Sequence, residues 1–150
     1  MNPPPLRGIH HVKLPVADLE RSLVFYRDVL GAVRIAAADH VDASGLRYAC
    51  ILDVPGLGTL LELRLDPEQA AATDGFDPLT LAIDDRAVLA AWREHLDGLG
   101  VAHSGEIPSI QAWLTVFADP DGIRLRLYTL EQHGPEIAAA VDHPWVERPS

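Results

Sequence analysis

The chain has 150 residues, of which 48% are hydrophobic and 23% are charged, and its formal net charge is −10 at pH 7. This length suits one domain or two small modules that share a core. The acidic balance argues against nucleic acid and anionic membranes as partners, and no apolar run approaches the roughly 18 residues of a membrane helix. A single cysteine, Cys50, excludes an intrachain disulfide. Since the N-terminus also lacks the pattern of a secretion signal, we expect a cytoplasmic protein.

Residues 8–65 predict a βαβββ module, which follows a Pro-rich lead at residues 1–7. Asp18 is a typical helix N-cap, and Gly31 is a typical residue at which a helix ends. Apolar residues between them recur at steps of three and four and predict one buried helix face, formed by Leu19, Leu23, Tyr26 and Leu30. The strands of this module are expected at residues 8–16, 33–38, 46–52 and 59–65, with Cys50 as a core residue.

Residues 76–130 repeat this plan after a polar, alanine-rich segment at 66–75, which we interpret as a linker. An offset of 67 residues aligns the first strands of the two modules and aligns Asp18 with Asp85. Two similar units of this length indicate a duplication and an α+β fold, in which each mixed sheet buries one face under its own helix. Strands are expected at 76–83, 101–107, 111–117 and 123–130, and the buried helix face consists of Val88, Trp92, Leu96 and Leu99.

A C-terminal tail, residues 131–150, follows the second module. Its alanine-rich segment at 137–141 is expected to form a short helix or an arm. The segment could pack on the body of the protein or on a second subunit, and the sequence leaves both alternatives open.

The stretch from His11 to Gly31, the duplicated βαβββ order and the Asp-Pro-Asp-Gly turn at 119–122 together resemble the vicinal oxygen chelate superfamily. That superfamily includes glyoxalase I, extradiol dioxygenases, and fosfomycin- and bleomycin-resistance proteins. The resemblance covers about residues 8–130. It implies curved mixed sheets around a cavity that takes a small-molecule ligand, and it implies a homodimer. The two modules could pair within one chain or exchange across the dimer, and the linker permits both arrangements.

The resemblance also implies a metal site, because the first and last strands of each module offer ligands to one divalent metal in this superfamily. His11 and Glu62 match the ligand positions of the first module, whereas the second module has Pro78 and Arg126 there. Neither of these has a lone pair to give to a metal. Transition-metal sites usually need three or more protein ligands, so a divalent metal cofactor and no cofactor both stay open. Candidate replacement ligands, which are otherwise surface or strand-end residues, are His40, His103 and Gln111.

Strand alternation places His11, Glu62 and Arg126 on the cavity faces of their sheets. We predict that Glu62 and Arg126 form an ion pair that replaces the metal electrostatically, because an unpaired buried charge is costly. The alternative is that Arg126 reaches the edge of the sheet and extends into water. Lys13 adds a further cation on the same face, which favours an anionic or enolate-forming ligand.

Two functions of different class follow from these residues. The first is a lyase, isomerase or dioxygenase in which His11, Glu62 and Arg126 are the candidate catalytic residues, with Glu62 as metal ligand or general base and Arg126 as oxyanion stabiliser. The second is a metal-free protein of the bleomycin-resistance type, which sequesters a drug or metabolite. Besides Lys13, the candidate ligand-binding residues are the aromatic side chains of Tyr48, Trp113 and Tyr128.

Overall fold

The computed structural model describes residues 1–147. The chain divides after Ala70 into two compact units, and each is described by itself below. Within residues 1–147, no helix combines the length and the apolar character that crossing a membrane requires.

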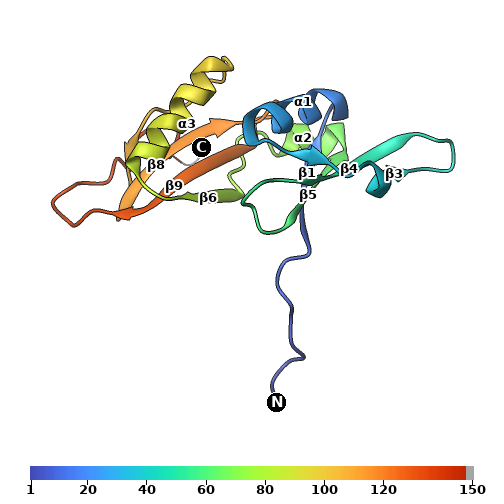
Figure 1. Ribbon diagram of the computed structural model, residues 1–150, viewed down its shortest axis with the longest axis horizontal. Helices are drawn as coiled ribbons and strands as arrows, with labels where there is room; N and C mark the ends of the chain where they lie inside the picture. The colour runs from blue at the N-terminus through green and yellow to red at the C-terminus, as the bar shows by residue number, and fades with distance from the viewer. Residues whose placement is uncertain (148–150) are drawn as a thin grey trace. The chain divides into compact units, whose positions relative to one another are not determined.

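The first unit is a mixed sheet with one long helix on one face (Figure 1). Its strands run in the order β1-β5-β4-β2, and β3 pairs with β4 off this path. β1 lies parallel to β5, whereas β4 lies antiparallel to it. The elements are β1 (His11–Val16), α1 (Leu19–Leu30), β2 (Val33–Arg34), a 3-10 turn η1 (Ala36–Ala38), β3 (His40–Val41), β4 (Arg47–Asp53) and β5 (Leu60–Leu65).

Helix α1 begins and ends where the sequence predicts. The Asp18 side chain accepts a hydrogen bond from the backbone N–H of Arg21, and Gly31 ends the helix in the left-handed conformation with φ 68°. The buried face differs slightly from the predicted one, because Ser22 and Val29 join Leu19 and Tyr26 in the core. Leu23 and Leu30, which were predicted to be buried, are only half-buried.

The second unit repeats the same strand path, β6-β9-β8-β7, with β6 parallel to β9. This matching order confirms the duplication of an α+β module. In the second unit, the Asp119 carboxylate holds the turn before β9, because it accepts hydrogen bonds from the backbone N–H groups of Asp121 and Ile123. The elements are β6 (Leu79–Ile83), α3 (Arg86–Gly98), β7 (Ile107–Pro108), β8 (Ala112–Ala118) and β9 (Arg124–Gln132).

Helix α3 buries a narrower face than the periodicity predicts. Leu89 and Leu96 are fully buried against the sheet, while Trp92, predicted as a core residue, is half-buried and Leu99 is 42% exposed. One residue step rotates a helix position by about 100°. The contact stripe therefore runs through Leu89 and Leu96, and the second apolar stripe through Val88 and Trp92 lies beside it.

Two predicted strands are wrong in extent. The strand expected at 33–38 stops at Arg34 and gives way to η1, and the strand expected at 101–107 is reduced to β7 with one isolated bridge between His103 and Phe117. The segment at 66–75, which we interpret as a linker, contains a short helix, α2 (Pro67–Ala72). Alanine-rich sequence after a proline favours such a turn of helix.

The tail packs on the body of the second unit as an arm without regular helix. We call residues 137–147 the C-terminal strap. Ala140, Trp145 and Val146 of the strap pack against the buried side chains of Ile107, Leu114 and Val116. The backbone N–H of Ala140 donates to the Pro108 carbonyl over 2.9 Å. The last three residues of the predicted tail, 148–150, lie outside the described part of the chain.

Candidate functional site

The strand register gathers charged side chains on one face of the first sheet. Lys13 of β1 lies beside Glu62 of β5, and Leu14 lies beside Leu63. Because side chains alternate along a strand, Glu62 and Arg64 point away from the face on which Leu61 and Leu63 enter the core. His11, two residues before Lys13, shares the face of Glu62. The predicted juxtaposition of His11, Lys13 and Glu62 within this unit therefore agrees with the register.

Glu62 is the centre of a compact polar group. Its carboxylate is buried, with 2% of the side chain exposed, and Oε1 lies 3.7 Å from Nε2 of His11 and 3.9 Å from Nε2 of His40. Nη1 of Arg64 donates to Oε2 over 3.2 Å. We call these four residues the Glu62 cluster. The two imidazoles and the guanidinium are 29–45% exposed, so a molecule from solvent can contact all three.

His40 reaches Glu62 through an irregularity between β3 and β4. His40 pairs with Ala49 but Val41 pairs with Arg47, so Tyr48 is an extra residue that faces no partner. A bulge of this kind re-aims side chains. The Tyr48 ring lies 5.7 Å from the His40 ring and 5.2 Å from the Arg64 guanidinium. The predicted ligand-binding residue Tyr48 therefore borders the Glu62 cluster.

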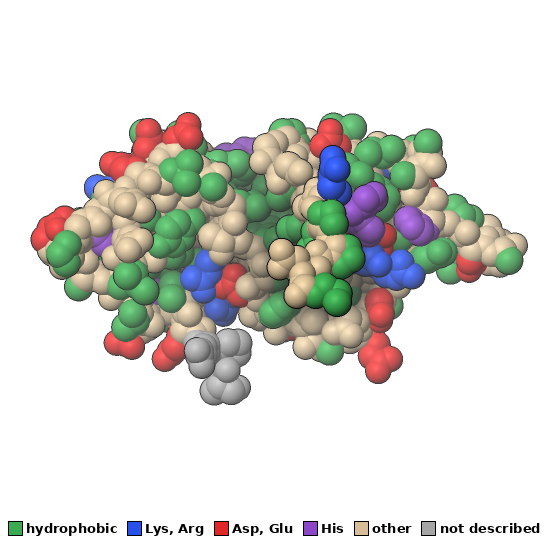
Figure 2. Space-filling model, turned by 90° about the horizontal axis from the view of Figure 1, so that it is seen from below, with side chains coloured by type: hydrophobic (Ala, Val, Ile, Leu, Met, Phe, Trp, Pro, Cys, Tyr) green, Lys and Arg blue, Asp and Glu red, His purple; other side chains and the backbone are tan. Residues whose placement is uncertain are grey.

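The surface of this unit carries a group of histidine, basic and acidic side chains (Figure 2). His10 extends the group, since its Nδ1 lies 2.9 Å from Nδ1 of His11. Arg64 is the member that sequence reasoning missed. Its position two residues after Glu62 on the same strand was the available signal, because that spacing puts both side chains on one face.

The candidate residues of the second unit lie in two separate groups. Nε of Arg126 donates to Oδ2 of Asp77 over 2.5 Å. Glu62 and Arg126 belong to different units and each has a charged partner within its own unit, so the pair between them stays a prediction. Tyr128 shares a 2.9 Å hydrogen bond with the Ser109 hydroxyl. Trp113, by contrast, lies under Arg86 of α3, with 4.5 Å between guanidinium and ring centroid, and contacts His133.

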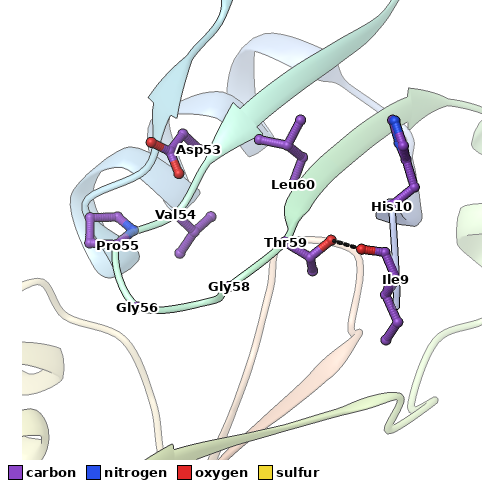
Figure 3. Close-up of a pocket in the computed structure, with 9 residues that line it drawn as sticks. All are labelled: Ile9, His10, Asp53, Val54, Pro55, Gly56, Gly58, Thr59 and Leu60. Carbon is purple, nitrogen blue, oxygen red and sulfur yellow. Dashed lines mark hydrogen bonds between the residues drawn. The ribbon is translucent and has the colours of Figure 1, made fainter. Parts of the chain in front are cut away.

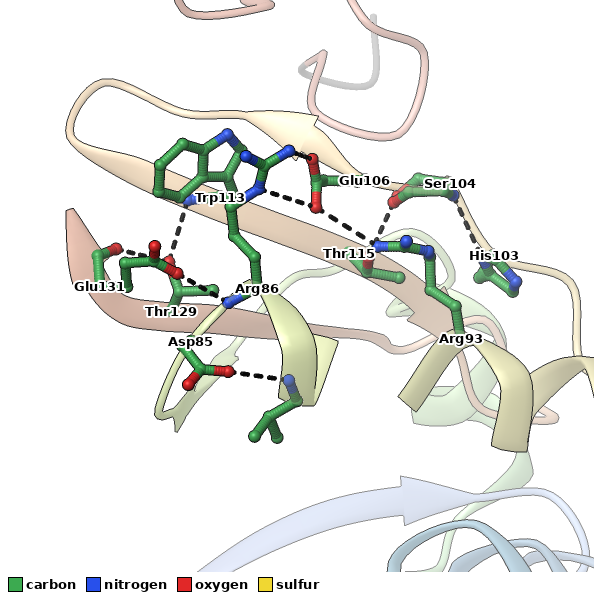
Figure 4. Close-up of polar contacts among 12 residues, drawn as sticks. Asp85, Arg86, Arg93, His103, Ser104, Glu106, Trp113, Thr115, Thr129 and Glu131 are labelled. Atoms are coloured by element: carbon green, nitrogen blue, oxygen red, sulfur yellow. Dashed lines mark hydrogen bonds and ion pairs between the residues drawn. The ribbon is translucent and has the colours of Figure 1, made fainter. Parts of the chain in front are cut away.

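Polar contacts at the start of α3 form a brace (Figure 4). Asp85 caps the helix at the Val88 N–H, as predicted. Glu106, immediately before β7, accepts hydrogen bonds from Arg86 and lies 3.6 Å from Nη1 of Arg93. The Arg86 hydrogen bonds hold the pKa of the Glu106 carboxyl below its usual value. These contacts tie α3 to the strand edge and give Trp113 and Arg86 a structural role.

The other two candidate replacement ligands, His103 and Gln111, lie in the second unit and make hydrogen bonds there. Nε2 of His103 lies 2.9 Å from Oδ1 of Asp97, and its Nδ1 accepts the Gly105 N–H. The backbone carbonyl of Gln111 accepts the His133 N–H, within the loop before β8. His40, by contrast, belongs to the same unit as Glu62 and is a member of the Glu62 cluster.

A depression of about 520 Å³ lies between the chain before β1 and the β4–β5 loop (Figure 3). Thr59 closes one side by donating its hydroxyl to the Ile9 carbonyl over 3.0 Å. Within the described part of the chain, its titratable lining residues are His10 and Asp53. The depression therefore borders the histidine pair but does not contain Glu62.

The residues present do not fit a resident metal ion. Transition-metal sites usually need three or more protein ligands, and residues 1–147 contain no group of three or more His, Cys, Asp or Glu side chains placed to hold an ion. Arg64 also brings a fixed positive charge to the carboxylate on which a metal would depend.

Comparisons with known proteins agree with this architecture. Residues 8–127 match the family described as Glyoxalase/Bleomycin resistance protein/Dioxygenase superfamily. A putative ring-cleaving dioxygenase, MhqA, from Bacillus subtilis (strain 168) is 29% identical over 133 residues, which is 86% of this chain and 42% of that protein. The chain thus spans less than half the length of this curated relative.

Two solved structures share the fold. A glyoxylase/bleomycin resistance protein/dioxygenase domain from Frankia sp. EAN1pec superposes with a TM-score of 0.66 at 22% identity, over 83% of this chain and 98% of that one. TnmS3, an antibiotic binding protein from Streptomyces sp. CB03234, superposes with a TM-score of 0.63 at 24% identity, over 83% of this chain and 96% of that one.

Proposed function

Since the chain belongs to the glyoxalase/bleomycin resistance protein/dioxygenase superfamily, we propose that it binds a small aromatic molecule with acidic hydroxyl groups at the Glu62 cluster, without a resident metal ion. The observation that carries this proposal is the charge compensation of Glu62. A guanidinium and two imidazoles already surround its buried carboxylate. The site is therefore electrostatically complete before any cation is added.

The local charge supports an anionic or ionisable ligand. Lys13 and Arg64 supply two fixed positive charges against the single negative charge of Glu62, although the whole chain carries −10. A phenol hydroxyl could donate to an imidazole nitrogen, and its phenolate form would be stabilised by the two cations. The Tyr48 ring borders the same face and offers an aromatic edge or face to the ligand ring.

The description of one relative supports a ring-shaped small molecule. MhqA is described as a putative ring-cleaving dioxygenase, which is compatible with an aromatic ligand. TnmS3 is described as an antibiotic binding protein, which is compatible with binding of a ligand. Retention of the ligand without chemistry agrees with the Glu62 cluster, because Arg64 already pairs with the carboxylate and no group of three or more His, Cys, Asp or Glu side chains among residues 1–147 is placed to hold an ion.

Titration with 4-nitrocatechol in the presence of EDTA tests the proposal, because the visible absorption of this probe reports its ionisation. We expect saturable binding, with the bound probe ionised. The variants His40→Gln and Lys13→Gln should each weaken binding at least about tenfold, which corresponds to 1.4 kcal/mol. Arg7→Gln, which removes a cation from the exposed N-terminal lead, is the matched control and should bind like wild type. Binding that needs added metal, or equal affinity in all variants, would contradict the proposal.

A ring-cleaving oxygenase is the second candidate function. It is favoured by the composition of the Glu62 cluster, in which two imidazoles approach one carboxylate, as in the two-histidine, one-carboxylate sites of non-haem iron enzymes. Anaerobic addition of Fe(II) followed by oxygen and 4-nitrocatechol distinguishes the two candidates. Oxygen uptake coupled to loss of the probe would favour the oxygenase, and unchanged probe would favour simple binding.

We further infer a cytoplasmic homodimer. The superfamily resemblance and the single, buried Cys50 support this inference. Light scattering coupled to size-exclusion chromatography measures the mass directly, and a mass of one 16.3 kDa chain would contradict the dimer.

A further inference from the structure

A small pocket of about 170 Å³ lies in the second unit, between the sheet and the C-terminal strap. Its walls are mostly apolar, formed by Ile107, Ile110 and Leu114 on one side and by residues 139–141 and Val146 of the strap on the other. Among residues 1–147, Arg126 and Ser109 are the lining residues with polar side chains. An apolar cavity of about 150 Å³ is large enough for benzene, so this pocket can take one small ring or a branched aliphatic chain.

Arg126 presents a cation to this apolar space. The Nε–H of Arg126 donates a hydrogen bond to Asp77. A guanidinium has five N–H donors, so the four N–H donors on its two Nη atoms can bind another acceptor. Arg124, two residues earlier on β9, adds a second positive charge on the same face of the strand. Arg126 is thus a charged side chain in a mostly apolar lining, which favours a ligand with an anionic group.

The strap is held over the pocket by polar contacts as well as by packing. Nη1 of Arg124 donates to the Trp145 carbonyl over 3.0 Å, and its guanidinium lies 5.8 Å from the Trp145 ring centroid. The Ala140 N–H is bonded to the Pro108 carbonyl. These contacts hold the strap to the body of the second unit at Ala140 and at Trp145, so the strap forms one wall of the pocket.

We propose that this pocket binds a small carboxylate with an apolar body, such as a monocyclic aromatic acid. Two Nη groups of Arg126 hold the carboxylate in a bidentate manner. The apolar body lies between Leu114 and the strap. Every residue of this pocket belongs to the second unit and none belongs to the Glu62 cluster, so the proposal stands or fails independently of the proposed function.

NMR titration with benzoate, using benzamide as its uncharged isostere, tests the pocket. The sequence contains three tryptophans, so the indole N–H signals are few, and Trp145→Phe identifies the signal of the strap. Benzoate should shift the Trp145 signal in a saturable way. Benzamide should bind at least about tenfold more weakly, because it lacks the charge that Arg126 recognises.

Two variants complete the test. Arg126→Gln should weaken benzoate binding at least about tenfold, with Arg7→Gln as the charge-matched control that binds like wild type. Because Arg126→Gln leaves Asp77 unpaired and could alter the fold, Ala139→Leu fills the pocket without touching that pair and should abolish the Trp145 shift. Equal affinity for benzamide, unchanged affinity in either variant, or no Trp145 shift at saturating benzoate would each overturn the proposal.

Discussion

His40 places Nε2 3.9 Å from the Glu62 carboxylate while its Nδ1 is buried without a hydrogen-bond partner among the described residues. A buried polar atom without a partner is uncommon in folded proteins and costs stability. The ring is nevertheless held in this position by the β3–β4 bulge and the Tyr48 ring. This arrangement agrees with a role for His40 in contacting a ligand rather than in stabilising the sheet.

Glu62→Gln is expected to lower the free energy of unfolding by about 1–3 kcal/mol, because Arg64 and both imidazoles lose the charge that they surround. Glu68→Gln is the matched control, since Glu68 is exposed on α2 and should change stability by less than about 0.5 kcal/mol. Urea unfolding followed by circular dichroism measures both. Equal stability of the two variants would mean that the carboxylate of Glu62 contributes no net stability.

Stability should fall in acid partly through Glu106. Hydrogen bonds from Arg86 lower its pKa from the model-peptide value of 4.5. A group whose folded-state pKa is depressed stabilises the protein above its unfolded pKa and loses this contribution as the pH falls through the folded pKa. Glu106→Gln should therefore cost about 1 kcal/mol at pH 7 and less below pH 4.5. Glu94→Gln, an exposed change on α3, should show no such pH dependence.

The two helix caps should contribute similar amounts. Asp18→Ala and Asp85→Ala each remove a carboxylate that accepts a backbone N–H at 2.9–3.0 Å, and each should cost about 1 kcal/mol of unfolding free energy. Asp18→Ser and Asp85→Ser retain a capping oxygen and should recover most of the loss. Thermal or urea unfolding distinguishes these pairs. Serine variants as unstable as the alanine variants would contradict capping as the cause.

Trp145→Ala should loosen the strap. The side chain packs against the cluster of Ile107, Leu114 and Val116 and lies beside Arg124. Because Trp145 is half-buried, we expect a loss of about 1–3 kcal/mol and increased binding of a hydrophobic dye to the uncovered face. Trp92→Ala, a half-buried tryptophan on α3, is the comparison. Dye binding that rises equally in both variants would argue against a specific cover.

The fold could be predicted because duplication made each pattern visible twice. The caps at Asp18 and Asp85 depend on local chemistry, and the strand order follows from the repeated alternation of apolar residues. Short edge strands were less predictable. Residues 101–107 contain apolar side chains and turn formers in similar numbers, and their pairing with β8 is limited to the His103–Phe117 bridge and to β7 at their end.

The candidate site was predictable only where regular alternation applies. His11, Lys13 and Glu62 meet as the register requires. His40 joins them because a bulge inserts Tyr48 into β4, and no sequence pattern marked that bulge. The covering of Leu114 by the strap was likewise left open, because a tail with weak periodicity can pack on its own chain or on a partner.

The central claim is that the Glu62 cluster works without a resident metal, and the metal content of tag-free protein tests it most directly. Elemental analysis of protein purified without chelators, followed by thermal unfolding with and without EDTA, gives two readouts. We expect transition metal far below one ion per chain and an unchanged melting temperature, because the Arg64 guanidinium already compensates the charge of Glu62. One ion per chain, lost in Glu62→Gln and in His40→Gln and accompanied by destabilisation in EDTA, would contradict it.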